Sequence, residues 1–390
     1  MTTTVEQREV VATAREWVER EVYPVASDYE HADEFPAPLV EDMKALGLFG
    51  VTIPERYGGL GLDLLTYVLI QIELSRGWMS LSGVLNTHFI SAWMIETHGT
   101  DEQRERYLPR MATGELRFAY SMTEPHAGSD VQSIRTRAVR EGDEYVITGQ
   151  KMWATNGLRA GAIMLLAVTD SGAEPRHKGM TAFIVEKEPE LEELPGLRIP
   201  GKLSKLGYKG VETTELLFDG FRTPRASVLG GDSGVGQGFY QFMGGIELGR
   251  VNIAARAVGI ATRAFEEAIR YAQQRETFGK PIAQHQAVQL KLAQMATKIE
   301  ASRLLTLQAA ERKSAGDRAD LEAGMAKLFA TETAQEVALE AMRIHGGYGY
   351  SQEFVVERIY RDAPLLIIGE GSNEIQQLVI ARRLLERYPV

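Results

Sequence analysis

Tyr120-Ser-Met-Thr-Glu-Pro-His-Ala-Gly-Ser-Asp130 places hydroxyl side chains and turn-forming residues where the chain changes from helical to strand-like patterning. Its proline and glycine favour irregular backbone. Tyr120, Thr123 and Ser129 carry hydroxyl groups that can bond a polar heterocycle or a diphosphate. The stretch therefore indicates a cofactor-binding loop. An ordinary capped turn is the alternative on these residues alone, because Thr-Glu and Ser-Asp pairs are common at turns and helix starts.

The spacing of apolar residues differs on the two sides of this stretch. Before it, three-to-four spacing predicts helices over residues 5–26, 37–46, 64–75 and 100–111. After it, short apolar runs between turn residues predict strands at 145–147, 163–168, 182–185 and 215–218. From about residue 235, long helical periodicity returns. The sequence thus predicts a mainly α chain of the α+β class, with domains over 1–115, 116–230 and 231–390.

A glycine-rich segment, residues 230–238, joins the second domain to the third. Glycine allows many backbone angles, so this segment is expected to be a flexible junction or a simple linker.

Composition limits the class of protein. A chain of 390 residues exceeds the length at which single cores stop growing, about 250–300 residues, so several packed units are expected. No apolar run reaches the roughly 18 residues of a membrane span, and the first residues lack the pattern of a secretory signal. A cytoplasmic protein without a membrane partner is the resulting expectation.

Charge and metal-binding residue types exclude further classes. The chain has no cysteine, and its seven histidines show no metal-binding spacing, so neither thiol nor metal chemistry is expected. A net charge of −10 disfavours a nucleic-acid surface.

Further motifs accompany the opening stretch in a fixed order. They are Pro54-Glu-Arg-Tyr-Gly-Gly-Leu-Gly61, Lys151-Met-Trp-Ala-Thr-Asn-Gly157, Arg275-Glu-Thr-Phe-Gly-Lys280, His345-Gly-Gly-Tyr-Gly-Tyr350, Arg361-Asp-Ala363 and Gly369-Glu-Gly-Ser-Asn-Glu-Ile375. Together these motifs resemble the acyl-CoA dehydrogenase family over nearly the whole chain. The resemblance implies an N-terminal helical domain, a central β-barrel domain and a C-terminal four-helix-bundle domain, with FAD bound between them.

No Gly-x-Gly-x-x-Gly fingerprint occurs, so a Rossmann site for the dinucleotide is not supported. The resemblance instead implies flavin contacts from the opening stretch and from two later segments. These contacts are Tyr120, Met122, Thr123, Gly128, Ser129, Trp153, Thr155, Ser372 and Glu374. An indole such as that of Trp153 can stack on a flat heterocycle, and Thr155 can bond its polar edge. Core packing is the alternative role for Trp153.

Another group of residues is implied to reach the FAD of a neighbouring subunit. It comprises Arg275, Thr277, Phe278, Gln286, Arg343, Gly346 and Gly347. Arg275 suits the diphosphate because a guanidinium can donate two parallel, charge-assisted hydrogen bonds to it. Its alternative role is to end a helix. Arg343 stands where the family often has glutamine, so the backbone of Gly346 and Gly347 is the more favoured contact.

Glu370 is the residue to which the resemblance assigns general-base catalysis. It follows the apolar run 365–368, and loss of water raises the pKa and basicity of a carboxylate. An adjacent helix amino terminus acts in the opposite direction. The alternative is an ordinary acidic residue beside a helix start.

The implied reaction is α,β-desaturation of an acyl-CoA thioester. Glu370 takes the α-proton, FAD N5 takes the β-hydride, and a trans-2-enoyl-CoA remains. The backbone N–H of Glu370 and a flavin ribityl hydroxyl would bond the thioester carbonyl.

Ser129, Glu247, Arg250 and Gly371 are implied to lie near the acyl-CoA. Gly249 occupies the place where some relatives carry the base, so that second base is absent. A surface ion pair is the alternative role for Glu247 and Arg250. Residues 76–100 and 239–250 are expected to line the acyl pocket, with core packing as the alternative. The candidates there are Trp78, Leu85, His88, Phe89, Trp93, Phe239, Tyr240 and Phe242.

The family resemblance also implies partners and a place in fatty-acid metabolism. We expect a homotetramer built as a dimer of dimers that passes electrons to an electron-transfer flavoprotein. Two other functions stay open: a flavin oxidase or monooxygenase on the same fold, and a nucleic-acid- or partner-binding protein that keeps flavin as a structural element. The acidic charge disfavours the second of these.

Overall fold

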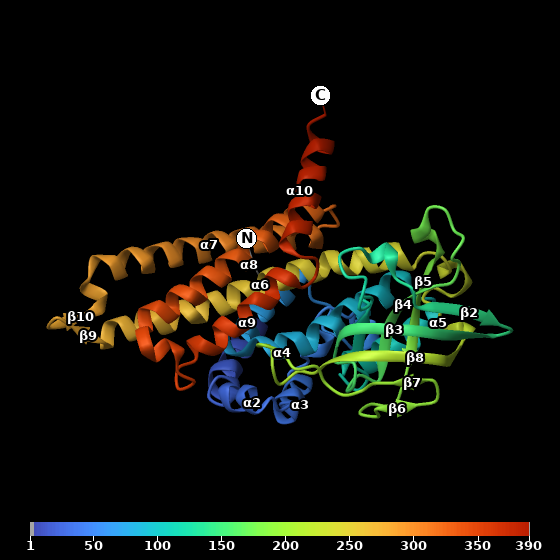
Figure 1. Cartoon of the computed structure of the whole chain (residues 1–390), viewed down its shortest axis with the longest axis horizontal. Coiled ribbons are helices and arrows are strands. Elements are labelled where there is room, and N and C mark those ends of the chain that lie inside the picture. Colours follow the sequence, from blue (N-terminus) through green and yellow to red (C-terminus); the bar gives the residue numbers. More distant parts are fainter. Residues whose placement is uncertain (1–3, 390) are drawn as a thin grey trace.

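The structure is a computed structural model that describes residues 4–389. Helices occupy one end and the centre of the molecule, and most strands gather at the other end (Figure 1). The order of helices, strands and helices along the chain agrees with the predicted fold class. Residues 1–3 and 390, which the predicted outer domains include, lie outside the described residues. The exact domain boundaries stay predictions.

The first unit is helical. Its helices are α1 (Val5–Trp17), α2 (Ala26–Ala32), α3 (Ala37–Ala45), α4 (Leu64–His98) and α5 (Asp101–Ala112). The single helix predicted over 5–26 is wrong, because α1 passes into a short π-helix, Val18–Val22, and then a turn that contains Pro24. Proline lacks the backbone N–H that a helix requires. Thr100 begins α5 with a capping box that includes Gln103.

Helix α4 is longer than the predicted segment 64–75. It continues to His98 across a kink at Trp78, whose backbone is extended (φ −159°, ψ 114°). Nearly every side chain after the kink is buried, including Ser80, Ser82 and Ser91. A helix that is enclosed on all sides has no polar face, so sequence periodicity does not reveal it.

The middle unit is built on one eight-stranded sheet, which confirms a β-rich second domain. Its strands are β1 (Phe118–Ser121), β2 (Arg137–Glu141), β3 (Glu144–Thr155), β4 (Ala162–Val168), β5 (Met180–Glu186), β6 (Glu193–Leu194), β7 (Leu197–Arg198) and β8 (Thr213–Pro224). The order is β1-β4-β2-β3-β8-β7-β6, and β5 pairs with β4. β1 runs parallel to β4, while β3 and β8 form a long antiparallel pair.

The last unit is a bundle of long helices. They are α6 (Gly238–Gln274), α7 (Gln286–Ser314), α8 (Asp320–His345), α9 (Val356–Ile368) and α10 (Asn373–Arg387). A small hairpin of β9 (Glu276–Thr277) and β10 (Lys280–Pro281) joins α6 to α7 at the far tip. Helix α10 projects away from the bundle (Figure 1). None of the helices within residues 4–389 is long and apolar enough to cross a membrane.

The glycine-rich segment 230–238 is a packed turn, not an open linker. Residues Gly231–Gly234 form a 3₁₀ turn. A Cβ atom on Gly238 would lie 2.5 Å from the backbone of Ala182 on β5. Glycine is needed here for close approach of α6 to the sheet, and this contact sets the direction in which α6 leaves the middle unit.

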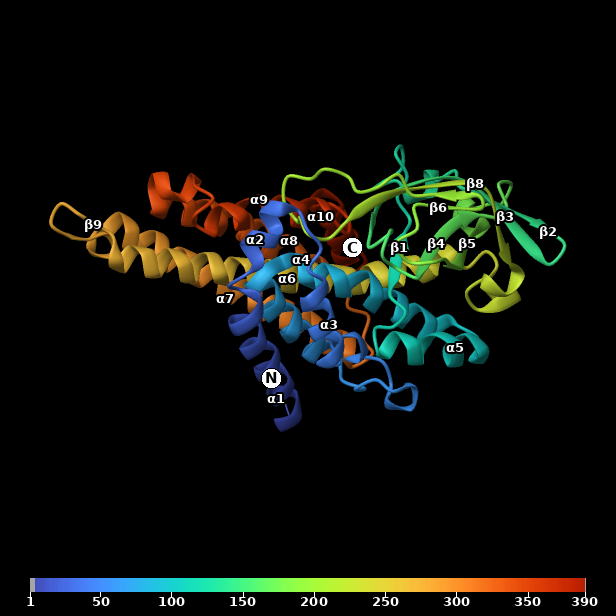
Figure 2. The same cartoon turned by 90° about the horizontal axis from the view of Figure 1, so that it is seen from below.

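Helix α6 lies at the centre of the molecule and packs along α4 (Figure 2). Its buried face consists mainly of small residues, such as Ala254 and Ala255. A Cβ atom on Gly259 would lie 2.4 Å from the carbonyl oxygen of Ile72, so the two helices approach very closely there. This close packing fixes α4 and α6 as the walls against which Glu370 is held.

Candidate active site

Glu370 lies in the turn between α9 and α10. Glu370 and Gly371 both have left-handed backbone, with φ of 54° and 83°. This turn directs the Glu370 side chain inward between α4 and α6. Asn86 of α4 donates a hydrogen bond from Nδ2 to Oε1 of Glu370 at 3.0 Å. A Cβ atom on Gly249 of α6 would lie 2.6 Å from Oε2. The carboxylate therefore rests on the bare backbone of Gly249.

The surroundings of this carboxylate tune its basicity in two directions. Burial raises the pKa of Glu370 above its ordinary value, because a desolvated carboxylate is less easily ionised. The hydrogen bond from Asn86 and the positive charges of Arg256, Arg250 and Lys327 oppose that rise. A carboxylate with these neighbours is a stronger base than a free glutamate and is still able to ionise.

The backbone around Glu370 offers a second chemical group. Within residues 4–389 the N–H of Glu370 has no hydrogen-bond partner. The neighbouring carbonyl of Gly371 is fixed by Nε2 of Gln376, which donates to it at 3.0 Å. Ser372 and Glu374 stand at the start of α10, on the carboxyl side of this turn. The turn thus holds a carboxylate and a free N–H donor side by side.

The opening stretch of the sequence forms the end of β1 and the loop after it. The Tyr120 hydroxyl donates to the carbonyl of Phe242 at 3.0 Å, and the Thr123 carbonyl accepts from the N–H of Met152 on β3 at 2.8 Å. Met122 is partly buried, whereas Gly128 and Ser129 are exposed. The structure therefore brings Tyr120, Met122 and Thr123 together with β3, and it leaves the remainder of the loop open.

Trp153 is not core packing. The pairing of β3 with β8 shifts register between Lys151 and Ala154. Trp153 lies in this bulge with a left-handed φ of 63°, and 56% of its surface is exposed. Thr155 is partly buried at the end of the same strand. A bulge re-aims a side chain, and here it presents a flat indole to the surroundings.

A buried ion pair that the sequence did not reveal ties these two segments together. Lys151 of β3 donates to Glu124 Oε1 at 2.9 Å and to the carbonyl of Met122 at 2.8 Å. The Glu124 carboxylate also accepts from the N–H groups of Arg135 and Thr136, at 2.7 and 2.9 Å. Both side chains of the pair are almost completely enclosed. They fix the opening loop against β3.

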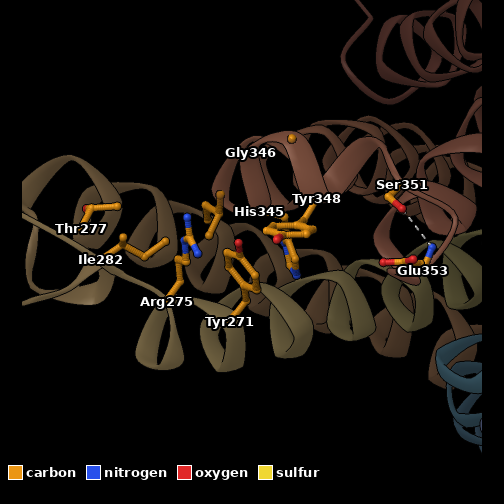
Figure 3. Close-up of a pocket in the computed structure, with 11 residues that line it drawn as sticks. Tyr271, Arg275, Thr277, Ile282, His345, Gly346, Tyr348, Ser351 and Glu353 are labelled. Carbon is orange, nitrogen blue, oxygen red and sulfur yellow. Dashed lines mark hydrogen bonds between the residues drawn. The ribbon is translucent and has the colours of Figure 1, made fainter.

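A pocket of about 610 Å³ lies at the far tip of the bundle (Figure 3). It is lined by Tyr271, Arg275, Thr277, Ile282, Ile344, His345, Gly346, Gly347, Tyr348, Ser351 and Glu353. The predicted group Arg275, Thr277, Gly346 and Gly347 is therefore brought together. Arg275 is the residue that caps the end of α6, so its alternative role also fits. Its guanidinium carbon lies 5.9 Å from the centre of the Tyr348 ring.

Other members of that predicted group do not line the pocket. Phe278 is 95% exposed in the turn between β9 and β10, and Gln286 is the first residue of α7. Arg343 forms an ion pair with Glu340, one turn earlier on α8. A side chain that is paired in this way agrees with the weaker expectation for Arg343.

The two predicted groups of flavin contacts lie far apart in one chain. The hairpin β9–β10 and the sheet with β3 stand at opposite ends of the molecule in both views (Figures 1 and 2). One chain does not bring Arg275 close to Trp153.

The surface ion pair of Glu247 with Arg250, which was the alternative role for these residues, does not form within the described residues. Glu247 instead accepts a hydrogen bond from Lys313 of α7 at 3.1 Å. Arg250 is turned into the interior, where burial lowers its pKa and the charges of Glu247 and Glu370 oppose that effect. Arg250 thus lies near Glu370, whereas Glu247 faces the outer helix.

The expected acyl-pocket residues fall into different environments. Trp78 stacks on Tyr29, and buried His88 meets the ring of Phe49 edge-on, so these two belong to the core. Phe89 stacks on Tyr67, with ring centroids 3.9 Å apart. The remaining candidates divide by burial: Leu85 and Phe242 are buried, Trp93 and Phe239 are half-buried, and Tyr240 is exposed.

Glu30, His31 and Glu357 form a cluster whose side-chain atoms are close enough to hold a metal ion. However, the guanidinium of Arg361 bonds both Glu30 and Glu357. The positive charge that these carboxylates need is therefore already supplied by the protein.

Three family models match consecutive parts of the chain. They are described as acyl-CoA dehydrogenase N-terminal domain, over residues 4–115, middle domain, over 119–221, and C-terminal domain, over 236–385. The chain belongs to the acyl-CoA dehydrogenase family. Like other members, it is a flavin-dependent oxidoreductase that acts on a CH–CH group, and its cofactor is FAD.

Relatives of this acyl-CoA dehydrogenase family member align over its full length. An acyl-CoA dehydrogenase of Bacillus subtilis is 42% identical, with 99% of each chain covered. A 3-(aryl)acrylate reductase of Clostridium sporogenes is 39% identical over 98% of this chain and 99% of the relative. The solved structure of butyryl-CoA dehydrogenase from Megasphaera elsdenii has a TM-score of 0.92 and 34% identity, with 99% of each chain covered.

The residues present fit FAD on two observations. The exposed indole of Trp153 offers a flat stacking surface beside Thr155. At the far pocket, a Cβ atom on Gly346 or Gly347 would meet nothing within 4 Å, so open space borders their backbone. Arg275 lies beside this space, and within the described residues its guanidinium makes no hydrogen bond or ion pair. Its charge is available for a diphosphate.

Proposed function

We propose that this protein desaturates an acyl-CoA thioester between its α- and β-carbons and releases a trans-2-enoyl-CoA. The observation that carries the proposal is the position of Glu370. Its carboxylate is partly enclosed between α4 and α6, it rests on Gly249, and its pKa is raised by burial. A carboxylate with these properties is suited to remove a weakly acidic proton.

Different residues of the chain would carry out catalysis, bind the substrate and bind the flavin. Glu370 accepts the α-proton on its carboxylate, and its unpaired backbone N–H donates to the thioester carbonyl, where negative charge develops. Ser129, Arg250 and Gly371 border the thioester end of the substrate. FAD, when bound, supplies the acceptor for the hydride that leaves the β-carbon. Tyr120, Met122, Thr123, Gly128, Ser129, Trp153, Thr155, Ser372 and Glu374 hold its flavin part.

The direction of the reaction is a second question. The Clostridium relative is named as a reductase of an acrylate. The same glutamate would return the proton in that direction, because a group that removes a proton also delivers it in reverse. We propose desaturation as the physiological direction, with an electron-transfer flavoprotein as the electron acceptor. Slow reoxidation of the reduced enzyme in air would support this choice over an oxidase, and fast reoxidation would contradict it.

We further propose that each FAD is held by two subunits. In support, the pocket with Arg275 and the strand with Trp153 lie at opposite ends of one chain. Phe278, beside the pocket, is 95% exposed, and Leu378 and Leu385 leave apolar surface on the projecting α10. Further copies of this protein would cover both surfaces, as in a dimer of dimers.

The proposed catalytic role is tested with Glu370→Gln. Glutamine keeps the shape and the backbone N–H but cannot accept the proton. We expect FAD, oligomer and ligand to bind normally and flavin reduction to slow by about 10²–10⁴-fold. The measurement is anaerobic bleaching of the flavin band after mixing with acyl-CoA thioesters of different length.

Glu247→Gln serves as the matched control, because Glu247 pairs with Lys313 and faces away from Gly249. Its rate should remain within a few-fold of wild type. If Glu370→Gln reduces its flavin within about tenfold of the wild-type rate, Glu370 is not the base. A large loss in Glu247→Gln would then move the assignment to that carboxylate.

The shared site is tested by mixing a variant that lacks the base with a variant that binds FAD weakly. A chain with Glu370→Gln keeps Arg275, and a chain with Arg275→Ala keeps Glu370. In a mixed dimer, one of the two sites would combine the intact Glu370 of one chain with the intact Arg275 of its partner. At an FAD concentration too low to saturate the Arg275→Ala protein, co-expression should therefore regain flavin reduction that neither variant shows alone. No regain in a proven mixed oligomer would contradict the shared site.

A further inference from the structure

Arg256 is a buried cation that forms no hydrogen bond or ion pair with a carboxylate of the described residues. It lies on α6 with 2% of its surface exposed. Within residues 4–389 its guanidinium forms no hydrogen bond or ion pair, and its Nε and Nη2 atoms are fully enclosed without a partner. Its guanidinium lies over the ring of Tyr208, whose centre is 4.9 Å from Cζ. A buried charge is costly unless it is paired, so this arrangement requires an explanation.

Two other arginines with little exposed surface show the usual arrangement. Arg263, also on α6 and also 2% exposed, donates to the Glu19 carboxylate at 2.6 Å. Arg361 forms a fork with Glu30 and Glu357. These two guanidinium groups thus have carboxylate partners, whereas Arg358, which is 2% exposed like Arg256, donates to the Gly77 carbonyl and has Nε and Nη1 unpaired within the described residues. The guanidinium of Arg256 lacks a carboxylate partner.

The position of Arg256 points to the substrate. It follows Gly249 by seven residues, so both lie on the same face of α6, about two turns or 10 Å apart along the axis. Side chains of a helix lean toward its amino terminus, which brings the Arg256 side chain back toward Gly249. The Glu370 carboxylate rests on Gly249.

Polar and aromatic groups connect the two positions. Asn252, between them on α6, donates to the Tyr67 hydroxyl at 2.9 Å. Burial raises the pKa of Tyr67, and the charge of Arg256 acts against that rise. Burial likewise raises the pKa of Glu370, and the charge of Arg256 opposes it more than any other single charge does. Arg256 therefore belongs to the enclosed group of residues around the base.

We propose that the acyl group of the substrate ends in a carboxylate that binds Arg256 while its α-carbon faces Glu370. The proposal rests on the proposed function and names its substrate class, the CoA monothioesters of short dicarboxylic acids. A guanidinium binds a carboxylate through two parallel charge-assisted hydrogen bonds. The span of about two helical turns, shortened by the Arg256 side chain, suits acids of about four to six carbons. The distal carboxylate takes no part in the bond changes.

The first experiment uses the wild-type holoenzyme and needs no variant. Flavin reduction is measured anaerobically with three pairs of thioesters of equal carbon number: succinyl- and butyryl-CoA, glutaryl- and valeryl-CoA, and adipyl- and hexanoyl-CoA. For at least one pair, kcat/KM should be about tenfold or more higher for the dicarboxylic member, the effect typical of a charge-assisted contact. Preference for the monocarboxylic member in every pair would overturn the proposal.

The second experiment assigns the preference to Arg256. Because the Arg256 charge also lowers the pKa of Glu370, Arg256→Gln should slow both members of a pair at neutral pH. At alkaline pH, where Glu370 is ionised in both proteins, it should reduce kcat/KM for the preferred dicarboxylic thioester by about tenfold or more relative to its monocarboxylic counterpart. Arg256→Lys keeps the positive charge but loses the paired N–H donors of the guanidinium. It should retain part of the preference for the dicarboxylic thioester. Arg263→Gln is the matched control, because it removes a buried arginine of the same helix that already has a carboxylate partner.

Each result separates this inference from the proposed function. Equal losses for both members of a pair in Arg256→Gln would mean that Arg256 acts only on Glu370 or Tyr208, and would overturn the proposal. Flavin reduction by monocarboxylic thioesters alone would overturn it while leaving the desaturase function intact. Failure of every thioester to reduce the bound flavin would reject the desaturase function, and this inference with it.

Discussion

Glu370 and Asn86 form the contact on which the chemistry at residue scale depends. Asn86 donates to the ionised carboxylate, and this bond lowers the pKa that burial raises. Asn86→Leu should therefore raise the pKa of Glu370 further and leave less of the base ionised at acidic pH. Flavin reduction should then rise with pH over a more alkaline range than in wild type, with the largest loss at low pH and the smallest at high pH.

The control for this pH profile is Ser91→Ala on the same helix. The Ser91 hydroxyl is buried and donates to the Thr87 carbonyl, away from the base. This variant should have the wild-type pH profile. An equal loss of rate at every pH in Asn86→Leu would contradict a role of Asn86 in holding the ionised form.

Gly249 makes a second prediction possible. A side chain on Gly249 would point directly at the Glu370 carboxylate, because its Cβ would lie 2.6 Å from Oε2. Glu370→Gly should remove the base, and adding Gly249→Glu to this variant should place a carboxylate in the same space from the opposite wall. We expect the double variant to reduce flavin at least about tenfold faster than Glu370→Gly alone. No gain in a folded, FAD-containing protein would contradict this geometry.

At the scale of elements, the Glu124–Lys151 pair joins the loop after β1 to β3. Lys151→Met would leave the buried Glu124 charge without its cation, so unfolding in urea should show a loss of about 3–5 kcal/mol. FAD should bind more weakly as well, because Met122 loses the contact that positions it.

Removal of both charges gives the matching control. In Glu124→Gln combined with Lys151→Met, no uncompensated charge stays buried, so the loss of stability should be smaller than in Lys151→Met alone. An additive loss from the two substitutions would show that the pair is not coupled in the folded protein.

For the whole molecule, the pocket at the tip of the bundle makes FAD binding depend on assembly. Arg275→Ala should weaken FAD binding by about 1.5–3 kcal/mol while the oligomer stays intact. Arg343→Ala should change FAD binding little, because the Arg343 guanidinium already pairs with Glu340. Flavin titration and light scattering measure the two properties separately. Unchanged FAD affinity in an intact Arg275→Ala oligomer would contradict the cross-subunit contact.

Sequence motifs predicted the fold class, and they assigned Glu370 to catalysis and Arg275 and Gly346 to the cofactor, roles that stay predictions. They could not predict the contact of Glu370 with Asn86, because these residues are separated by 284 positions and meet only through packing of α4 against the turn before α10. The kink at Trp78 was missed for a related reason. Burial on all sides removes the pattern of polar and apolar residues from which helix length is estimated.

The distance between β3 and the β9–β10 hairpin has a thermodynamic consequence for the holoenzyme. If each flavin bridges two chains, cofactor binding and subunit association are linked equilibria, and each must favour the other by the same factor. Added FAD would then tighten the dimer, and dilution would release the yellow cofactor from chains that are still folded. The fraction of protein that retains FAD would then increase with protein concentration by mass action. If one chain held the whole cofactor, this fraction would not depend on subunit association.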